Sequence, residues 1–455
     1  MKSCFLGFDL GTSALKGVLV SGDGRLLAAA KRVCVLSRPE AGRVEFDATA
    51  QFSDIVAMVK ELAAQLPPGG RVESLCFAGA SGNTLLCDAQ GEPLSNAFSW
   101  MDTRANADNC PTLAKLLALP VRQTVGWPPI PMFPLAHLAW LKENQPGLFA
   151  RAAQVGMNTD HILFRLTGRR GMDHSTATTF YLQDQEKRQW HQPFLDILGI
   201  KEAQLPELLP SGSVLGTLTE AAASLTGLDA STKVELGCFD HPAAARGCGV
   251  FAEGDLLLSC GTSWVGFYPT PKRGVALGLE MLSDPFLSPG GPWGAMFSVP
   301  MIGGNVDQYV DKHICPGPEP MESKYRRFDA LAASAPANGL ALDLREAPAA
   351  HGAAPAVLAR AVMESAARLV AEKIKALAAA GLHPRRVVMV GGPSNSPAWT
   401  RVVASVTGLR VELLDCRQHA GALGAALLGA VGAGRFRDER EAFAAFEHRS
   451  ETILP

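Results

Sequence analysis

The 455-residue chain lacks the patterns that mark zinc-binding, redox and secreted proteins. Its ten cysteines form no Cys-x-x-Cys pair, have no histidine arrangement suited to zinc nearby, and lie mostly inside apolar runs. Such cysteines are typical of buried, reduced thiols, so we expect neither a cysteine metal centre nor a catalytic cysteine. The N-terminus meets Asp9 after only a few apolar residues, unlike a secretory signal. We therefore expect a cytoplasmic protein.

The sequence also lacks an excess of charge and a long apolar run. The formal net charge is -2, with 19% charged residues and no block of basic residues. A chain without a basic stripe predicts neither nucleic acid nor an anionic membrane surface as a partner. No apolar run approaches the roughly 18 residues that span a bilayer.

Two common nucleotide-binding motifs are absent as well. The pattern Gly-x-x-x-x-Gly-Lys-Ser/Thr does not occur, and no Gly-x-Gly-x-x-Gly opens a helix after a strand. The first absence argues against a P-loop nucleotidase, and the second against a dinucleotide-binding fold.

The most informative feature that is present is a repeated Gly-Thr-Ser turn. F-D-L-G-T-S-A-L-K-G spans Phe8–Gly17, and L-S-C-G-T-S-W-V-G spans Leu258–Gly266. A strand that turns on Gly-Thr-Ser gathers backbone N–H groups and hydroxyls, which suits a polyphosphate. One such turn alone is an ordinary hairpin, but Asp9 before it and Lys16 behind it add a carboxylate for Mg²⁺ and a cation. The predicted phosphate-binding residues are Gly11, Thr12, Ser13, Lys16, Gly261, Thr262 and Ser263.

The order of predicted elements repeats in the two halves of the chain. The first half reads as strands 4–8, 15–20 and 26–35, a helix over 50–65 and a strand over 72–78. The second half has strands 255–260 and 264–268, a helix over 356–380 and a strand over 387–390. This order is that of actin-like nucleotide-binding domains. We predict an α/β fold of two actin-like (ribonuclease H-like) domains, 1–247 and 248–455, each a mixed sheet flanked by helices, with a cleft between them.

One segment interrupts this duplication, and two more lie near the end of the chain. Residues 111–228 are richer in proline and aromatics, and we interpret them as an insertion that covers the cleft and shapes the substrate site. The stretch after Gly434 is charged and predicts a helical surface tail. The small-residue stretch Ala420–Gly434 predicts a tightly packed helix.

Asp240 is the strongest candidate for a catalytic group. It follows a predicted strand over 233–236 in V-E-L-G-C-F-D-H-P, and a helix of small residues comes next. This position suits a general base that takes a hydroxyl proton during attack on a γ-phosphate. The alternative is that Asp240 is the N-cap of a helix over Pro242–Arg246.

These motifs together resemble the FGGY carbohydrate kinases, the family of glycerol, xylulose and ribulose kinases in the actin-like ATPase superfamily. Eight segments carry the resemblance in the family's order. They are Asp9–Lys16, Trp100–Arg104, Asn158–Gly168, Leu205–Gly212, Gly237–Asp240, Ser259–Ser263, Val390–Trp399 and Gly421–Ala426.

The resemblance implies roles for individual residues. Asp240 matches the catalytic base, Asp9 the carboxylate near magnesium, and the two turns match the loops around the β- and γ-phosphates. Gly391, Gly392 and Asn395 match the loop beside the adenosine. Asp102 and Arg104 match the sugar-contacting W-x-D-x-R segment, in which Trp100 is either a wall of the sugar pocket or a core residue.

The chain departs from the family pattern at three places. Xylulose kinases have Gly-Gln-Met-His-Gly where this chain has Gly79-Ala80-Ser81-Gly82-Asn83, so Ser81 stands at a sugar-contact position. His241 replaces the usual Asn or Gln after the base, and could contact a substrate hydroxyl or cap the following helix. A P-Y-L-x-G-E-R segment is not recognisable in the region 337–354.

The sequence therefore predicts ATP-dependent phosphorylation of a ketopentose-like sugar, such as a pentulose, or of a polyol, with ATP and Mg²⁺ required. The alternative is a catalytically weak sugar or nucleotide sensor on the same fold. The resemblance also allows a homodimer.

Overall fold

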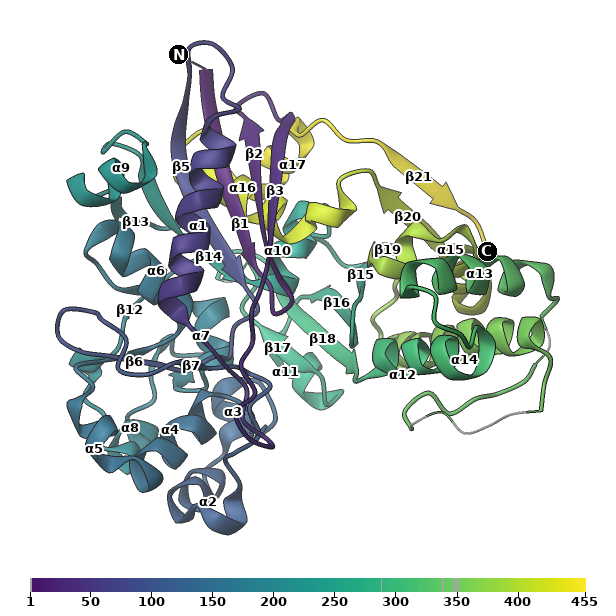
Figure 1. Cartoon of the computed structure of the whole chain (residues 1–455), viewed down its shortest axis with the longest axis horizontal. Helices are drawn as coiled ribbons and strands as arrows, with labels where there is room; N and C mark the ends of the chain where they lie inside the picture. The colour runs from purple at the N-terminus through teal and green to yellow at the C-terminus, as the bar shows by residue number, and fades with distance from the viewer. Residues whose placement is uncertain (1, 288, 338, 347, 349–351) are drawn as a thin grey trace. The chain divides into compact units, whose positions relative to one another are not determined.

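The computed structural model describes residues 2–287, 289–337, 339–346, 348 and 352–455 (Figure 1). The chain forms two compact units. Unit 1 comprises residues 1–249, 283–286 and 419–447, and unit 2 comprises 250–282, 287–418 and 448–455. The predicted boundary at 247 lies close to the end of the first long run of unit 1. The segments 283–286 and 419–447, which the sequence assigns to the second domain, belong to unit 1.

A six-stranded mixed sheet forms the centre of unit 1. Its order is β13-β14-β5-β1-β2-β3, in which β1 runs parallel to β5 and antiparallel to β2, and β14 runs parallel to β5. The strands are β1 (Lys2–Leu10), β2 (Ala14–Ser21), β3 (Leu26–Val33), β5 (Gly70–Gly79), β13 (Val214–Thr217) and β14 (Lys233–Phe239). This arrangement places the ends of β1 and β14 at the same edge of the sheet, on either side of β5.

The two faces of this sheet are covered differently. On one face, Leu6 and Phe8 of β1 pack with Phe52 and Ile55 of α1 (Ala48–Ala63), which lies over the sheet and runs along its strands in Figure 1. Because side chains alternate along a strand, Asp9 points to the opposite face. That face is covered by α16 (Ala420–Gly432), which is almost completely buried and contacts β1 and β5.

Helices α16 and α10 (Asp240–Gly247) pack backbone to backbone. A Cβ atom on Gly424 would overlap the carbonyl oxygen of Ala243, so only glycine allows this approach. The small residues of 420–432 therefore bring the helix that begins at Asp240 against the helix that covers Asp9. This confirms the predicted tightly packed helix and explains why residues 419–447 belong to unit 1.

Unit 2 repeats the strand arrangement of unit 1. Its sheet has the order β17-β18-β16-β15-β19-β20-β21, in which β15 runs antiparallel to β16 and parallel to β19, as β1 does to β2 and β5. The strands are β15 (Asp255–Cys260), β16 (Trp264–Thr270), β17 (Leu282–Asp284), β18 (Trp293–Val299), β19 (Arg386–Gly391), β20 (Arg410–Leu414) and β21 (Ser450–Ile453). The predicted duplication is confirmed.

Helices complete unit 2 and its hydrophobic core. They are α11 (Arg273–Gly278), α12 (Ile302–Tyr309), α13 (Met321–Ser334), α14 (Pro355–Ala379) and α15 (Pro397–Thr407).

The prediction of a helical tail after Gly434 is correct for only part of that stretch. Helix α17 (Glu439–Ala445) forms, but Ser450–Ile453 pair antiparallel with β20, because an edge strand of the sheet offers unpaired backbone groups.

The segment 111–228 contributes eight helices to unit 1, among the residues described. They are α2 (Pro111–Leu117), α3 (Val121–Val125), α4 (Pro134–Asn144), α5 (Pro146–Arg151), α6 (Asn158–Thr167), α7 (His174–Phe180), α8 (Gln192–Leu198) and α9 (Glu220–Thr226). Eight short strands form four two-stranded sheets, β4 with β7, β6 with β8, β9 with β12 and β10 with β11. They are β4 (Glu45–Phe46), β6 (Leu85–Cys87), β7 (Ala97–Phe98), β8 (Gln154–Gly156), β9 (Gly171–Asp173), β10 (Gln183–Asp184), β11 (Gln189–Trp190) and β12 (Glu207–Leu209).

Two expectations concern what is missing from the chain. Within the described part of the chain, no helix has the length and apolar character needed to cross a bilayer. The region 337–354, where the P-Y-L-x-G-E-R segment is not recognisable, falls partly outside the described residues. Its described residues form neither a helix nor a strand.

Candidate active site

Asp9 is held at the end of β1 by its neighbours on two elements. Lys16 lies directly opposite it on β2, and on its other side Gly421 of α16 leaves room for the carboxylate. A Cβ atom on Gly421 would lie 2.7 Å from Asp9 Oδ2. The other oxygen, Oδ1, is buried and has no hydrogen-bond partner among the described residues. A buried carboxylate oxygen without a partner is ready to bind a cation or a donor that arrives with a ligand.

Asp240 is the first residue of α10 and follows directly on β14. Its Oδ1 accepts a hydrogen bond of 2.7 Å from the backbone N–H of His241, and 26% of the side chain is exposed. The N-cap residue of α10 is Phe239, whose side chain makes no capping hydrogen bond. The alternative prediction that Asp240 caps the helix is therefore wrong, since a cap would accept from the second or third residue beyond it.

The electrostatics of Asp9 and Asp240 are linked. Burial raises the pKa of Asp240 to about 7, against the hydrogen bond from His241. Burial also raises the pKa of Asp9 to about 7, with a further increase from Asp240 and an opposing effect of Lys16. Two carboxylates in one poorly solvated place disfavour a second negative charge, so both change protonation near neutral pH.

His241 stands beside the two carboxylates as a neutral ring. Burial lowers its pKa to about 4, although the charge of Asp9 opposes this shift. Nε2 lies 3.8 Å from Asp240 Oδ1, beyond hydrogen-bond distance, and the ring meets Phe239 edge-on at 5.2 Å. A neutral imidazole at this place can accept a hydrogen bond from a ligand hydroxyl or donate one to it.

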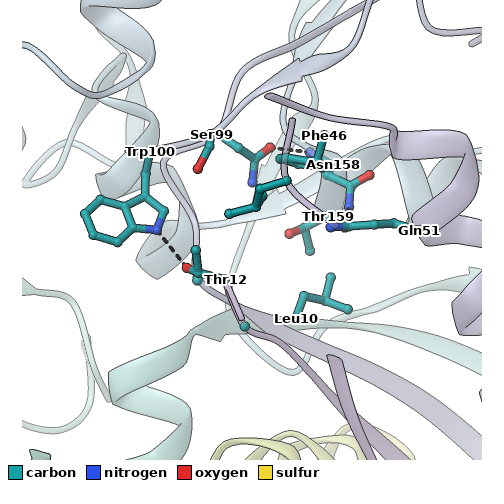
Figure 2. Close-up of a pocket in the computed structure, with 12 residues that line it drawn as sticks. Leu10, Thr12, Phe46, Gln51, Ser99, Trp100, Asn158 and Thr159 are labelled. Carbon is teal, nitrogen blue, oxygen red and sulfur yellow. Dashed lines mark hydrogen bonds between the residues drawn. The ribbon is translucent and has the colours of Figure 1, made fainter. Parts of the chain in front are cut away.

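The first Gly-Thr-Ser turn is linked to Trp100. The indole Nε1 donates a hydrogen bond of 2.8 Å to Thr12 Oγ1, as Figure 2 shows. Behind this contact lies a pocket of about 30 Å³, whose described lining is uncharged. Its polar members are Thr12, Gln51, Asn83, Ser99, Asn158 and Thr159. A volume of this size accommodates roughly one water molecule or one hydroxyl-bearing carbon. Trp100 is thus a partly exposed wall rather than a core residue.

Asp102 and Arg104 form a buried ion pair with each other. Asp102 is 0% exposed, and its Oδ2 accepts from Val44 N at 2.7 Å and from Arg104 Nη2 at 2.6 Å. Burial raises the pKa of Asp102, but the Arg104 side chain and the backbone N–H groups of Val44 and Arg104 together outweigh this effect, and the net pKa lies below its ordinary value. Arg104 also donates to Glu45 and lies 3.8 Å above the Phe98 ring. The pair fixes the W-x-D-x-R segment that carries Trp100.

Ser81 lies in the loop that follows β5 and is 3% exposed. Its hydroxyl donates to the carbonyl oxygen of Gly79 at 3.1 Å, a bond that shapes the loop locally. Next to it, Asn83 Oδ1 accepts from the backbone N–H of Asn158 at 2.7 Å. The loop is therefore ordered by its own small polar side chains where the family pattern has longer ones.

The second Gly-Thr-Ser turn is supported by the start of α12 in unit 2. Gly303 N donates to the carbonyl oxygen of Thr262 at 2.9 Å, and Met301 N donates to Ser263 Oγ at 3.2 Å. A Cβ atom on Gly303 would overlap the carbonyl oxygen of Gly261. Thr262 and Gly261 remain exposed. This contact is not predicted from the sequence, although the Gly303-Gly304 pair after Pro300 is typical of close backbone approach.

We expect Gly303→Ala to raise KM for ATP by about tenfold or more, because the added methyl group must displace the turn. Steady-state ADP release against ATP concentration measures this change. Gly304→Ala is the matched control, since its Cβ would meet only the mobile end of Met301 at 3.4 Å. Equal KM values for the two variants would contradict the assignment of the second turn to phosphate binding.

A larger pocket of about 630 Å³ adjoins the second turn within unit 2. Gly392 and Asn395 line it together with Trp264 and Trp399, whose buried rings pack edge to face at 5.2 Å. Gly391 lies at the end of β19 and accepts a hydrogen bond from Ser394 Oγ at 2.7 Å. An apolar floor with polar groups on its rim is the chemistry that a nucleoside requires.

The metal prediction fits the residues present. The described residues hold no group of three or more histidine, cysteine or acidic side chains that would enclose a metal by itself. Magnesium in phosphoryl-transfer sites is usually held by one or two carboxylates plus phosphate oxygens and water. Asp9, with its unpartnered buried oxygen, meets that requirement.

The structure thus gathers the predicted residues into two groups. Unit 1 brings together Asp9, Lys16, Asp240 and His241, with Gly11, Thr12, Ser13 and Trp100 on the first turn and its neighbour. Unit 2 brings together Gly261, Thr262, Ser263, Gly391, Gly392 and Asn395. Trp264 and Trp399 are not predicted as pocket residues from the sequence, because aromatic residues in apolar runs are more often part of a core.

The comparisons with known proteins agree with this geometry. The N-terminal domain of the FGGY family of carbohydrate kinases matches residues 4–247, and its C-terminal domain matches residues 325–433. The chain is 26% identical to xylulose kinase of Bacillus subtilis over 99% of this chain and 92% of the relative. It is also 26% identical to autoinducer-2 kinase of Klebsiella pneumoniae, over 96% of this chain and 87% of the relative.

A solved structure extends the agreement to the fold. The crystal structure of xylulose kinase from Rhodospirillum rubrum superposes with a TM-score of 0.86 at 26% identity, over 99% of this chain and 94% of the other. This confirms the predicted two-domain actin-like fold. The matched domains cover more than half of the chain, and the N-terminal match contains the first Gly-Thr-Ser turn and Asp240, so the protein belongs to the FGGY family of carbohydrate kinases.

Proposed function

We propose that this kinase transfers the γ-phosphoryl group of ATP to a hydroxyl of a neutral ketopentose-like sugar or a polyol, with Asp240 as general base. The observation that carries the proposal is the Asp240 carboxylate at the start of α10, whose pKa burial raises to about 7. A base with a pKa near the working pH combines a useful ionised fraction with a real affinity for the proton.

In the proposed phosphoryl transfer, one bond to the γ-phosphorus forms as another breaks. The acceptor hydroxyl gives its proton to Asp240 as its oxygen forms a bond to the γ-phosphorus, and the bond from that phosphorus to the ADP oxygen breaks. His241, neutral because burial lowers its pKa to about 4, can orient the same hydroxyl or its neighbour. Trp100 offers an indole face to the carbon side of the sugar.

Sugar kinases of this family use ATP, and we assign its adenosine to the pocket lined by Gly392, Asn395 and Trp399. The two Gly-Thr-Ser turns supply backbone and hydroxyl donors to the phosphates, with Lys16 as the cation of the first turn. When bound, Mg²⁺ supplies positive charge that neutralises the phosphate oxygens. Asp9 is the residue that would hold it.

The acceptor is neutral for an electrostatic reason. Arg104, the cation of the sugar-contact segment, is already paired with Asp102 and Glu45, with only 5% of its side chain exposed. The pocket beside Trp100 has an uncharged lining among the residues described. A sugar acid would leave its carboxylate without a partner at this place, which is costly. The relatives that are xylulose kinases favour a ketopentose.

The test is ADP release with ATP and Mg²⁺ against a panel of pentuloses, deoxyketoses, polyols and aldonic acids. We expect at least one neutral ketose or polyol to raise ADP release well above the rate with water alone, and aldonic acids to be poor. Turnover with aldonic acids only would overturn the neutral acceptor. Tight ATP binding without turnover on any member would favour a sensor, an alternative to which the comparisons give no support. A homodimer and a cytoplasmic location stay predictions.

A further inference from the structure

Four residues, Ser283–Phe286, belong to unit 1 although the chain on both sides of them belongs to unit 2, and although Ser283 and Asp284 are also part of β17, the edge strand of the seven-stranded sheet. Their backbone is fixed within unit 1 at Ser283. Its N–H donates to Gly126 O at 3.0 Å, and its carbonyl oxygen accepts from Trp127 Nε1 at 3.0 Å and Gln185 Nε2 at 2.9 Å. We call these four residues the 283–286 segment.

The next residue of the segment, Asp284, reaches the element that carries the base. Its side chain is fully buried, and Oδ2 accepts a hydrogen bond of 2.7 Å from Ser175 Oγ at the start of α7. Ser175 Oγ in turn accepts the backbone N–H of Phe239 at 3.2 Å. Because the serine proton points to Asp284, a lone pair of the same oxygen is directed to Phe239, the residue immediately before Asp240.

Phe239 needs this support because the ladder between β14 and β5 is irregular there. The register shifts between Leu236 and Phe239, where Gly237 passes very close to the backbone of Phe77. The last strand residue before the base is therefore positioned partly by a side-chain hydrogen bond and not by the sheet alone.

The same segment also holds the far end of α10. Arg246, whose side chain is 1% exposed, donates from Nη2 to the carbonyl oxygen of Phe286 at 2.8 Å, and its guanidinium lies 4.6 Å above the Phe286 ring. Arg246 also pairs with Glu439 at 3.4 Å. Both ends of the helix that begins with Asp240 are thus anchored on four residues.

We propose that Asp284 is a positioning residue for the reaction: through Ser175 it fixes the backbone at Phe239 and so directs the Asp240 carboxylate toward the acceptor hydroxyl. This inference rests on the proposed role of Asp240 as base. The competing interpretation is that the Asp284–Ser175–Phe239 chain only stabilises the fold.

The experiment separates the two interpretations with five variants, one of which is Asp240→Asn, and one control. Ser175→Ala and Asp284→Ala each break the chain of hydrogen bonds, while Asp284→Asn keeps an oxygen that can accept from Ser175. Because small misplacement of a catalytic group is costly, we expect both alanine variants to lower kcat by about 10- to 100-fold with KM for ATP unchanged. Asp284→Asn should keep kcat within about threefold. The double alanine variant should lose no more than the larger single loss.

The control is Glu364→Ala in α14, which removes a buried carboxylate paired with Arg360 and Arg368 in unit 2. It should lower the melting temperature and leave kcat per folded molecule unchanged. Wild-type kcat per folded molecule in Ser175→Ala and Asp284→Ala, with Asp240→Asn inactive, would overturn the positioning role alone. Normal turnover in Asp240→Asn would instead overturn the assignment of the base, and this inference with it.

Discussion

Asp240→Asn is expected to lower kcat by about 10²- to 10⁴-fold, the range that removal of a general base typically costs. Asparagine keeps the size and shape of the side chain, and its oxygen can still accept the N–H of His241. What it cannot do is take the proton of the acceptor hydroxyl. The residual rate then reflects phosphate binding and orientation alone.

Two measurements make this result specific. ATP affinity, measured by titration without acceptor, should stay within about twofold because the adenosine pocket lies in unit 2. His241→Asn, which introduces a residue common in the family at this position, is the matched control and should keep substantial activity. An Asp240→Asn enzyme that retained most of its kcat would exclude Asp240 as the base.

The second large effect is on stability, and it has the opposite sign. Burial raises the folded-state pKa of Asp240 to about 7, whereas an unfolded aspartate has a pKa of about 3.9. The folded state therefore binds a proton that the unfolded state has lost between these two values. By linkage, the contribution of Asp240 to the free energy of unfolding is fully present below about pH 4 and is lost as pH rises to about 7. The loss is up to about 4 kcal/mol, at 1.36 kcal/mol per pKa unit.

Asp240→Asn escapes this decline because an amide does not ionise. We expect the variant to be more stable than the wild type at about pH 8, and the difference to shrink toward about pH 5. Thermal unfolding across this range measures it. The control is Asp229→Asn, since hydrogen bonds from Ser231 lower the pKa of that exposed carboxylate and its loss cannot stabilise. A stability gain in Asp240→Asn that does not depend on pH would contradict the raised pKa.

The two predictions express one property of the site. Asp9 and Asp240 share a poorly solvated place next to Lys16. Burial raises the pKa of each carboxyl to about 7, and the charge of Asp240 contributes a further increase to the pKa of Asp9. Burial that makes Asp240 a base at neutral pH also lowers the free energy of unfolding when this carboxylate is ionised. Such sites commonly exchange stability for activity.

Much of the site follows from local sequence. The hairpins at Gly11 and Gly261 and the strand before Asp240 are patterns of neighbouring residues, and a strand end fixes where each side chain lies. The role of Asp102 and Arg104 could not be predicted in this way. Their partners, Val44 and Glu45, are more than fifty residues away in the chain, and only the folded structure brings them together.

The same limit applies to the packing of the last part of the chain. Composition predicts that 420–434 packs tightly, but not that it packs on the sheet of unit 1. Likewise, the four residues of β21 carry a weak strand signal of their own and become a strand because β20 offers an unpaired edge. The 283–286 segment has no local signal at all, since its role depends on Ser175 and Arg246.

The packing of α16 on unit 1 has a consequence for how the chain is made. A ribosome delivers β1, β5 and β14 early, but the helix that covers the Asp9 face of their sheet is delivered only after nearly all of unit 2. Until then, residues such as Cys76, Ala78 and Cys238, which pack with Ala425 and Leu428, have no cover from that helix. Nascent chains fold domain by domain and are prone to aggregate while apolar surface is open. The first half of this enzyme is therefore completed last, and a chain that ends before residue 419 should be insoluble rather than merely inactive.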